Sequence, residues 1–332
     1  MSKNETILLT GGAGYIGSVT SKILLERSYN VIVVDNLSTG YKDALSEDIK
    51  FYQVSTLDKE DLKTVFEQNL DIKAIMHFAS NIEVGESVIN PSKYFYNNVV
   101  GGLNIIDAAR EYNIEGFIFS STAAVYGEPK VIPIPEDSLT SPINPYGVSK
   151  LHLENYLKYY FNAYKLKHVI LRYFNACGAY KNLGENHHPE SHLIPNAIKS
   201  VLGGNNSLNI WGNKYNTPDG TPIRDYIAVE DIANAHILAL EAILSNNISN
   251  EILNIGNGLG YSVMEIVQMI EKVTGKKVPY TIKPARPGDT SVLIAGIDKI
   301  QQILHWKPMR NLEHIISSAY EWHKNHPNGY EN

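Results

Sequence analysis

Short apolar runs alternate with longer amphipathic stretches through the first half of the chain. The apolar runs have the length of buried strands, and they are Ile7 to Thr10, Val31 to Asp35, Ala74 to Ala79 and Phe117 to Ser121. The stretches between them carry apolar residues three and four positions apart, which predicts helices at Tyr15 to Arg27, Asp58 to Leu70, Pro91 to Tyr112 and Pro145 to Tyr164. This rhythm predicts an α/β fold built on a doubly wound parallel sheet.

The pattern changes in the second half of the chain. After the strand-like segment His168 to Asn175, residues Gly178 to Pro189 are rich in Gly, Asn and His, which is typical of a loop. Two later strand-like segments, Arg224 to Val229 and Ile252 to Gly256, flank the helical stretch Glu230 to Leu244. We therefore expect the chain to return to the first domain before leaving it. The expected domains are residues 1–176 with 224–256, and a smaller α/β domain of residues 177–223 with 257–332.

The composition excludes several classes of protein. The 332 residues carry a formal net charge of -6, which leaves no broad basic surface, so we expect neither nucleic acid nor a membrane as partner. A single cysteine, Cys177, excludes an internal disulfide and favours a reducing compartment, the cytoplasm. The first apolar run is too short for a signal peptide, and no run reaches the roughly 18 apolar residues of a membrane span.

A glycine-rich turn follows the first predicted strand. Gly11, Gly14 and Gly17 form a GxxGxxG pattern directly before a predicted helix, where backbone amides and the helix dipole can hold a pyrophosphate. Asp35 ends the next strand, where its carboxylate can accept hydrogen bonds from the adenosine ribose and would repel a 2′-phosphate. Together they predict a Rossmann-type site that prefers NAD to NADP. The alternative is an ordinary tight turn beside a helix-capping aspartate.

A tyrosine four residues before a lysine can form an acid–base pair on one helix face. The spacing occurs at Tyr126/Lys130, Tyr146/Lys150 and Tyr320/Lys324. The first pair is interrupted by Gly127 and Pro129, and the third is far in sequence from the glycine turn, so we select Tyr146 and Lys150. Lowering the phenol pKa from about 10 to near 7 requires about 4 kcal/mol, which one lysine cation at about 4 Å supplies.

Thr122 is expected to complete this site. It directly follows the strand Phe117 to Ser121 and lies 24 residues before Tyr146. Its hydroxyl would hydrogen-bond the reacting hydroxyl. The alternative is a strand-end threonine without a catalytic role.

The motifs resemble those of a known family. GGAGYIG, DNL, HFA, SSTAAVYG, YGVSK and RYFN are similar to the extended short-chain dehydrogenases/reductases that act on nucleotide sugars. GES, PDGTPIRDYIAVEDIA and RPGD narrow the resemblance to the bacterial UDP-glucose 4-epimerases. It spans residues 6 to about 306.

The resemblance implies a cofactor site and a substrate site. NAD would contact Gly11, Gly14, Tyr15, Ile16, Gly17, Asp35, Asn36, Leu37, Thr56, Leu57, Phe78, Ala79, Ser80, Asn97, Ser120, Tyr146, Lys150 and Tyr173. The UDP-sugar would contact Thr122, Asn175, His192, Leu193, Trp211, Arg224, Arg286, Asp289 and Leu293. Three positions depart from the family pattern: Thr56, where many relatives have Asp, Ile82, where many have Lys, and Ala285, where Arg is common.

The implied reaction is epimerisation of UDP-glucose and UDP-galactose at C4. Tyr146 would take the proton of the sugar 4-hydroxyl, and Thr122 would polarise that hydroxyl. NAD would hold the hydride while the 4-keto sugar rotates to present its other face. A 4,6-dehydratase is the nearest alternative, but that family places Asp and Glu after the threonine, where this chain has Ala123 and Ala124. A NAD-binding regulator without turnover is the alternative from another class.

Three further expectations concern metal, assembly and specificity. His187, His188 and His192 lie on a loop without a nearby cysteine and with only Glu190 as a carboxylate partner, so we predict no metal site. The resemblance implies a homodimer through a four-helix bundle formed by Pro91 to Tyr112 and Pro145 to Tyr164, although their apolar stripes fit a sheet-facing core equally well. It also places Leu293 beside the sugar C2 substituent, so we expect weak turnover of UDP-N-acetylglucosamine beside the main activity, and a 4-epimerase of UDP-N-acetylglucosamine or another UDP-sugar is a further alternative.

Overall fold

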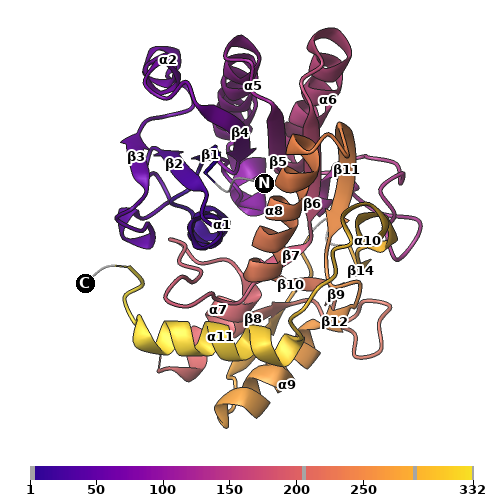
Figure 1. Cartoon of the computed structure of the whole chain (residues 1–332). Coiled ribbons are helices and arrows are strands. Elements are labelled where there is room, and N and C mark those ends of the chain that lie inside the picture. Colours follow the sequence, from indigo (N-terminus) through magenta and orange to yellow (C-terminus); the bar gives the residue numbers. More distant parts are fainter. Residues whose placement is uncertain (1–3, 204–206, 287–289, 331–332) are drawn as a thin grey trace.

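The computed structural model describes residues 4–203, 207–286 and 290–330. A seven-stranded parallel sheet forms its centre, with the strand order β11-β6-β5-β4-β1-β2-β3 (Figure 1). The strands are β1 (Thr6–Thr10), β2 (Asn30–Asp35), β3 (Lys50–Gln53), β4 (Ile72–His77), β5 (Gly116–Thr122), β6 (His168–Tyr173) and β11 (Asn250–Ile255). The order reverses direction between β1 and β4, which opens a crevice at the carboxyl ends of the strands. The predicted doubly wound Rossmann-type sheet is confirmed.

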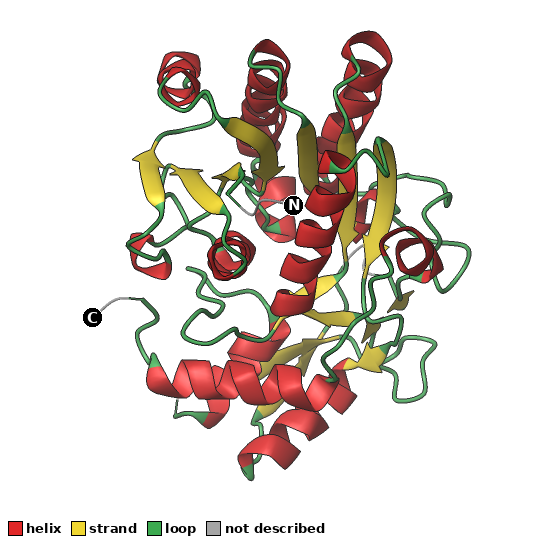
Figure 2. Cartoon of the chain, in the orientation of Figure 1, coloured by secondary structure: helices red, strands yellow, loops and turns green. Residues whose placement is uncertain are grey.

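Helices cover both faces of this sheet, as Figure 2 shows. One face packs against α1 (Tyr15–Glu26), α8 (Val229–Leu244) and α10 (Asp298–Leu304), and the other against α2 (Lys59–Glu67), α5 (Gly101–Glu111) and α6 (Pro145–Tyr164). The strand residues are buried on both sides because each face meets a helical layer. Among the described residues, no helix is long and apolar enough to cross a membrane.

The second half of the chain builds a separate group of small sheets and helices. Its parallel pairs are β7 (Asn175–Cys177) with β10 (Tyr226–Ala228), β8 (Leu208–Trp211) with β13 (Tyr280–Lys283), and β9 (Ile223–Arg224) with β14 (Val292–Leu293), and β12 (Tyr261–Ser262) pairs with β9 in the antiparallel direction. The helices α7 (Leu193–Val201), α9 (Val263–Thr274) and α11 (Leu312–Asn325) share one apolar core with β7, β8 and β10. This group lies below the main sheet in Figure 1.

Two predicted elements differ from the structure. The expected strand Arg224 to Val229 is split into β9 and β10, and β10 pairs with β7 rather than with the main sheet. The expected helix Pro91 to Tyr112 is divided into α4 (Pro91–Tyr94), the π-helix η2 (Phe95–Val100) and α5. The π-helix carries the buried Asn98, whose amide donates hydrogen bonds to Asn81 and Ser149. An internal polar anchor of this kind is not visible in apolar periodicity.

The remaining short elements lie at the carboxyl ends of the main strands. They are η1 (Lys42–Ala44), α3 (Val84–Ile89) and η3 (Ala123–Val125). Strand β3 was not predicted because its residues are at most half-buried at the sheet edge, so its sequence lacks an apolar run.

Candidate active site

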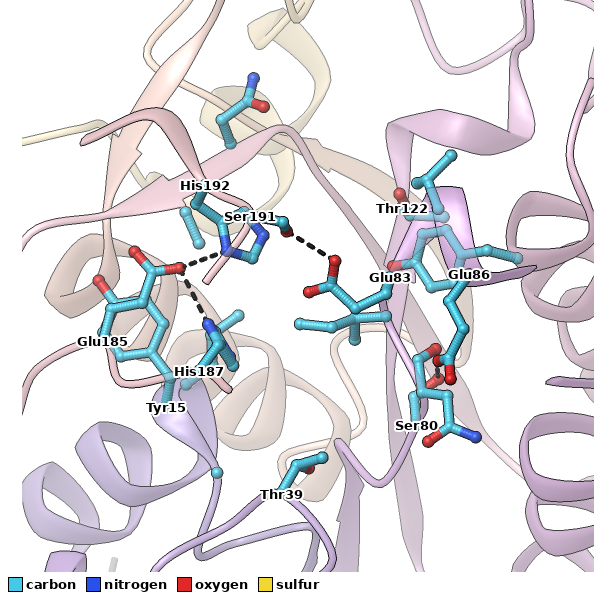
Figure 3. A pocket seen from close by; sticks show the side chains of 18 of the residues that line it. Tyr15, Thr39, Ser80, Glu83, Glu86, Thr122, Glu185, His187, Ser191 and His192 are labelled. Carbon is cyan, nitrogen blue, oxygen red and sulfur yellow. Dashed lines mark hydrogen bonds and ion pairs between the residues drawn. The ribbon is translucent and has the colours of Figure 1, made fainter. Parts of the chain in front are cut away.

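A cavity of about 2090 Å³ lies between the carboxyl ends of the main strands and the second half of the chain. Almost all the described residues that were predicted to contact cofactor or substrate line it, and Figure 3 shows part of its wall. Leu57 is the exception, because its side chain lies beside Gly101 of α5 and does not reach the cavity. Asp289 lies outside the described residues.

The glycines of the turn are required by close backbone approaches. Gly11 has a φ of +72°, and a Cβ on it would lie 2.4 Å from the backbone nitrogen of Ala79. A Cβ on Gly17 would lie 2.3 Å from the carbonyl oxygen of Gly11. Gly14 is the N-cap of α1, and no side chain caps the first amides of the helix. The amino end of α1 is therefore a cradle that fits an anionic pyrophosphate.

Asp35 ends β2 on the wall of the same cavity. Its Oδ2 accepts the amide hydrogen of Ala13 at 3.0 Å, and its Oδ1 accepts that of Leu37 at 2.8 Å. Burial raises the pKa of this carboxyl group, and the two amides counteract that rise. Each carboxylate oxygen retains capacity to accept a further hydrogen bond, so the residue fits a ribose diol.

Tyr146 lies in the first turn of α6, which Asn144 caps by accepting the amide hydrogen of Gly147 at 2.8 Å. Burial raises the pKa of Tyr146 to about 12, the Thr122 hydroxyl lowers it, and the charge of Glu83 raises it. This direction is opposite to the one that the Tyr–Lys spacing predicted. Burial removes the water that would stabilise a phenolate, and the nearby lysine is directed elsewhere.

Lys150 donates from its Nζ to the carbonyl oxygen of Ser120 at 2.9 Å, and it is 2% exposed. Burial lowers its pKa to about 7, while the charge of Glu154 raises it. Glu154 lies one turn further along α6 and accepts hydrogen bonds from Arg172 of β6 at 3.0 and 2.6 Å. This buried pair fixes α6 on the sheet, so the lysine is held at the end of β5.

The opposite wall offers an aromatic ring and two guanidinium groups. The guanidinium carbon of Arg286 lies 4.9 Å from the ring centroid of Trp211. Arg224 of β9 donates to its neighbour's carbonyl at 2.9 Å and to the carbonyl oxygen of Thr290 at 2.8 Å. A planar ring with one cation beside it and a second in the lining of the same cavity suits a nucleotide base with a diphosphate.

The remaining residues predicted for the substrate come from separate elements. Asn175 begins β7 and donates from its amide to the carbonyl oxygen of Asp225 at 2.8 Å. Leu193 begins α7, and Leu293 lies in β14, in register with Arg224. All three line the cavity.

Sequence reasoning missed a contact that crosses the cavity. Ser191 donates from its hydroxyl to Glu83 at 2.6 Å, and Figure 3 shows this bond between opposite sides of the pocket. The two residues are 108 positions apart, so no local motif signals the contact. The nearest signal is the position of Glu83 directly before the Val-Gly-Glu-Ser segment, at the carboxyl end of β4.

Sequence reasoning also missed Glu185 on the same loop. Its Oε1 lies 3.0 Å from Nδ1 of His192 and 3.4 Å from Nδ1 of His187, as Figure 3 shows. Burial opposes the negative charge, but the two imidazoles outweigh burial and hold the pKa of Glu185 below its usual range. Burial likewise opposes the charge of His192, yet Glu185 and Glu190 raise its pKa well above the usual value.

The site's likeness to known proteins agrees with this geometry. Residues 7–256 match the NAD dependent epimerase/dehydratase family. A UDP-glucose 4-epimerase of Halalkalibacterium halodurans is 47% identical over 98% of this chain and 97% of its own.

Solved structures extend the likeness to three dimensions. UDP-glucose 4-epimerase from Brucella ovis in complex with NAD is 43% identical with a TM-score of 0.92, covering 96% of this chain and 98% of that one. The enzyme from Bifidobacterium longum in complex with NAD+ and UDP is 36% identical with a TM-score of 0.93, covering 98% and 99%. The chain therefore belongs to the NAD dependent epimerase/dehydratase family.

Proposed function

We propose that this chain is a UDP-glucose 4-epimerase, an isomerase that interconverts UDP-glucose and UDP-galactose with NAD as cofactor. The observation that carries the proposal is one continuous cavity whose walls hold different chemistry. The dinucleotide cradle lies on one side, the Trp211, Arg224 and Arg286 group lies on the other, and Tyr146 is also part of the lining. Relatives with NAD and UDP in their structures support the assignment.

Different residues of the chain would bind the cofactor, transfer the proton and hold the substrate. The amides at the start of α1 would hold the pyrophosphate of NAD, Asp35 the adenosine ribose, and Lys150 the nicotinamide ribose. When bound, NAD supplies the hydride acceptor and a positive charge near the reacting carbon. Once the positive charges of bound NAD and of Lys150 favour its phenolate, Tyr146 would accept the proton of the sugar 4-hydroxyl, and Thr122 would hydrogen-bond that hydroxyl. The arginines hold the diphosphate while the sugar presents its other face.

The residues after Thr122 argue against a 4,6-dehydratase. Elimination at C5 and C6 requires an acid–base pair in addition to the tyrosine. Ala123 and Ala124 both line the cavity here, and their methyl groups cannot transfer protons. An intact set of Thr122, Tyr146 and Lys150 argues against a regulator without turnover.

Incubating the purified protein with UDP-galactose and analysing the products tests the proposal. We expect UDP-glucose without stoichiometric release of NADH. A 4-keto-6-deoxy sugar would identify a dehydratase, net NADH formation a dehydrogenase, and no product a binding protein.

We further propose that the chain acts in the cytoplasm and that it forms a homodimer. We also propose that it is divided into the two domains that the sequence predicts. Parts of the helix faces expected at the interface are used otherwise, because Ile106, Leu153 and Leu157 pack against the sheet. Large apolar side chains nevertheless remain on the outside of η2 and α6: Phe95 is 37% exposed, Tyr96 61%, Val100 39% and Tyr159 68%. An uncovered aromatic surface of this kind supports a second copy as partner. Sedimentation equilibrium tests it, and a monomer at micromolar concentration would contradict it.

A further inference from the structure

A compact group of nitrogen and oxygen donors lies on the loop that joins β7 to α7. It consists of Glu185, His187, Glu190 and His192, whose ligand atoms all lie within 4.8 Å of one another. Figure 3 shows the Glu185 carboxylate pointing toward both imidazole rings, beside Tyr15 of the cofactor cradle. The proposed epimerase mechanism uses Tyr146, Lys150 and Thr122, and of the four donors only His192 is among the residues expected to contact the UDP-sugar.

The distances within the group match a metal's coordination sphere. A tetrahedral Zn²⁺ with bonds of about 2.0 to 2.1 Å holds its ligand atoms roughly 3.3 Å apart. Nδ1 of His192 lies 3.0 Å from Glu185 Oε1 and 3.1 Å from Glu190 Oε1, and Nδ1 of His187 lies 3.4 Å from Glu185 Oε1. Three edges of the tetrahedron therefore already have the required length.

Two atoms of the group lack the hydrogen bonds that buried polar atoms normally make. Oε2 of Glu190 is buried without a hydrogen-bond partner, and Nδ1 of His187 is buried with only a 3.4 Å ion-pair contact to Glu185 Oε1 that does not reach hydrogen-bond geometry. The Glu190 side chain is 6% exposed, and Lys199 approaches it no closer than 3.9 Å. Buried polar atoms without partners are uncommon in folded proteins, because a bound water or ion usually satisfies them.

Charge and donor type select the ion. When a divalent cation displaces the proton of His192, two carboxylates and two neutral imidazoles surround it and the assembly has no net charge, which lowers the cost of burying both carboxylates. Imidazole nitrogens favour zinc over magnesium or calcium, which prefer all-oxygen shells. Four protein ligands leave no open position, which is the arrangement of structural zinc sites.

We propose that Glu185, His187, Glu190 and His192 bind a structural Zn²⁺ ion that fixes the loop of residues 185–192 against the cofactor side of the cavity. The sequence prediction of no metal site did not include Glu185, which the fold adds as the central ligand. The ion ties together the segment that also provides Ser191 for the contact with Glu83.

His188 provides a matched control, because it is exposed on the same loop and lies outside the group. Untagged full-length wild type, His187→Ala and His188→Ala are stripped with a chelator, equilibrated with Zn²⁺ or Co²⁺ and dialysed. We expect one Zn²⁺ per chain in wild type and in His188→Ala. In His187→Ala the Kd for Zn²⁺ should rise by about 100-fold or more, because losing even an outer-shell partner weakens a site by about 10- to 100-fold.

Cobalt absorption and thermal unfolding supply readouts independent of activity. Bound Co²⁺ should give the intense visible bands of a tetrahedral site, and Zn²⁺ should raise the Tm of wild type but not of His187→Ala. Glu185→Gln provides a second ligand variant, and the wild-type metal content decides the matter if that variant does not fold. Metal content well below one per chain in wild type, an octahedral cobalt spectrum, or equal affinities for His187→Ala and His188→Ala would overturn the proposal and leave an ion-pair cluster without metal.

Discussion

The two walls of the cavity are built by different means. On the sheet wall, residues that act together are neighbours in sequence: Gly11 and Gly17 span one turn, and Tyr146 and Lys150 lie on one helix. On the opposite wall, Arg224 meets Thr290, which is 66 positions away, and Trp211 meets Arg286. Groups held by one regular element can be placed from their spacing, whereas groups joined by distant segments depend on the whole fold.

The two walls also differ in how deeply their side chains are buried. Asp35 and Lys150 are at most 8% exposed, while Trp211 is 37% exposed. A side chain enclosed by protein has no room to adjust, so its replacement should cost more than that of a half-exposed one. The comparison therefore predicts that substitutions have the largest effects on the sheet wall.

Replacing Tyr146 with Phe should produce the largest loss. The hydroxyl that accepts the proton is removed while the ring still fills its space, so kcat should fall by about 1,000-fold. UDP affinity, measured by calorimetry, should stay unchanged because the nucleotide contacts lie on the other wall. Tyr159→Phe, on the exposed side of the same helix, is the control and should retain activity. Near-normal turnover of Tyr146→Phe would remove this residue from its role.

Replacing Asp35 with Asn should weaken NAD binding by roughly 10- to 100-fold. The amide cannot accept from both Ala13 and Leu37 while also holding the ribose, and hydrogen bonds to a charged group contribute about 1.5 to 3 kcal/mol. The preference for NAD over NADP should decrease with it. Fluorescence titration with both cofactors measures the ratio. Asp58→Asn, at the cap of α2, is the control, and equal NADP binding by wild type would contradict the assignment.

These two predictions use residues whose proposed roles came from the sequence, and the fold shows why their positions could be predicted. Strand-end position and helix spacing determine where Asp35, Tyr146 and Lys150 lie, so the family and the sheet were predictable. The pKa direction of Tyr146 was not, because burial and the Ser120 carbonyl decide where the lysine charge acts. Glu185 and Glu83 were not found either, since their partners come from loops whose path no periodicity reveals.

Substituting Leu293 should shift specificity by several-fold rather than remove activity. Leu293 is half-buried in the cavity wall, and the family resemblance predicts that its isobutyl group limits the space for the C2 substituent of the sugar. Leu293→Tyr should lower kcat/KM for UDP-N-acetylglucosamine relative to UDP-glucose, and Leu293→Cys should raise it. Val292→Cys, the neighbouring position outside the cavity lining, should leave the ratio unchanged. If neither variant at position 293 alters the ratio, this residue does not control acceptance.

Replacing Glu83 with Gln should have the smallest effect, visible in the pH profile. The charge of Glu83 raises the pKa of Tyr146, so removing that charge lowers the pKa and favours the phenolate. The acid limb of kcat/KM should therefore move to lower pH by less than about one pH unit. Glu86→Gln, on the same segment and paired with Lys93, is the control. A shift toward higher pH would contradict the assigned influence of Glu83.

A single cysteine on β7 can report when β7 and β10 separate. Cys177, the chain's single thiol, lies on β7 at 3% exposure and donates to the carbonyl oxygen of Ile227 on β10. Burial raises its pKa, so both access and thiolate content are low until these strands separate. The rate at which a thiol reagent modifies Cys177 therefore reports how often β7 and β10 separate. Ligands that contact both walls of the cavity should lower the rate of Cys177 modification, although they make no contact with its sulfur.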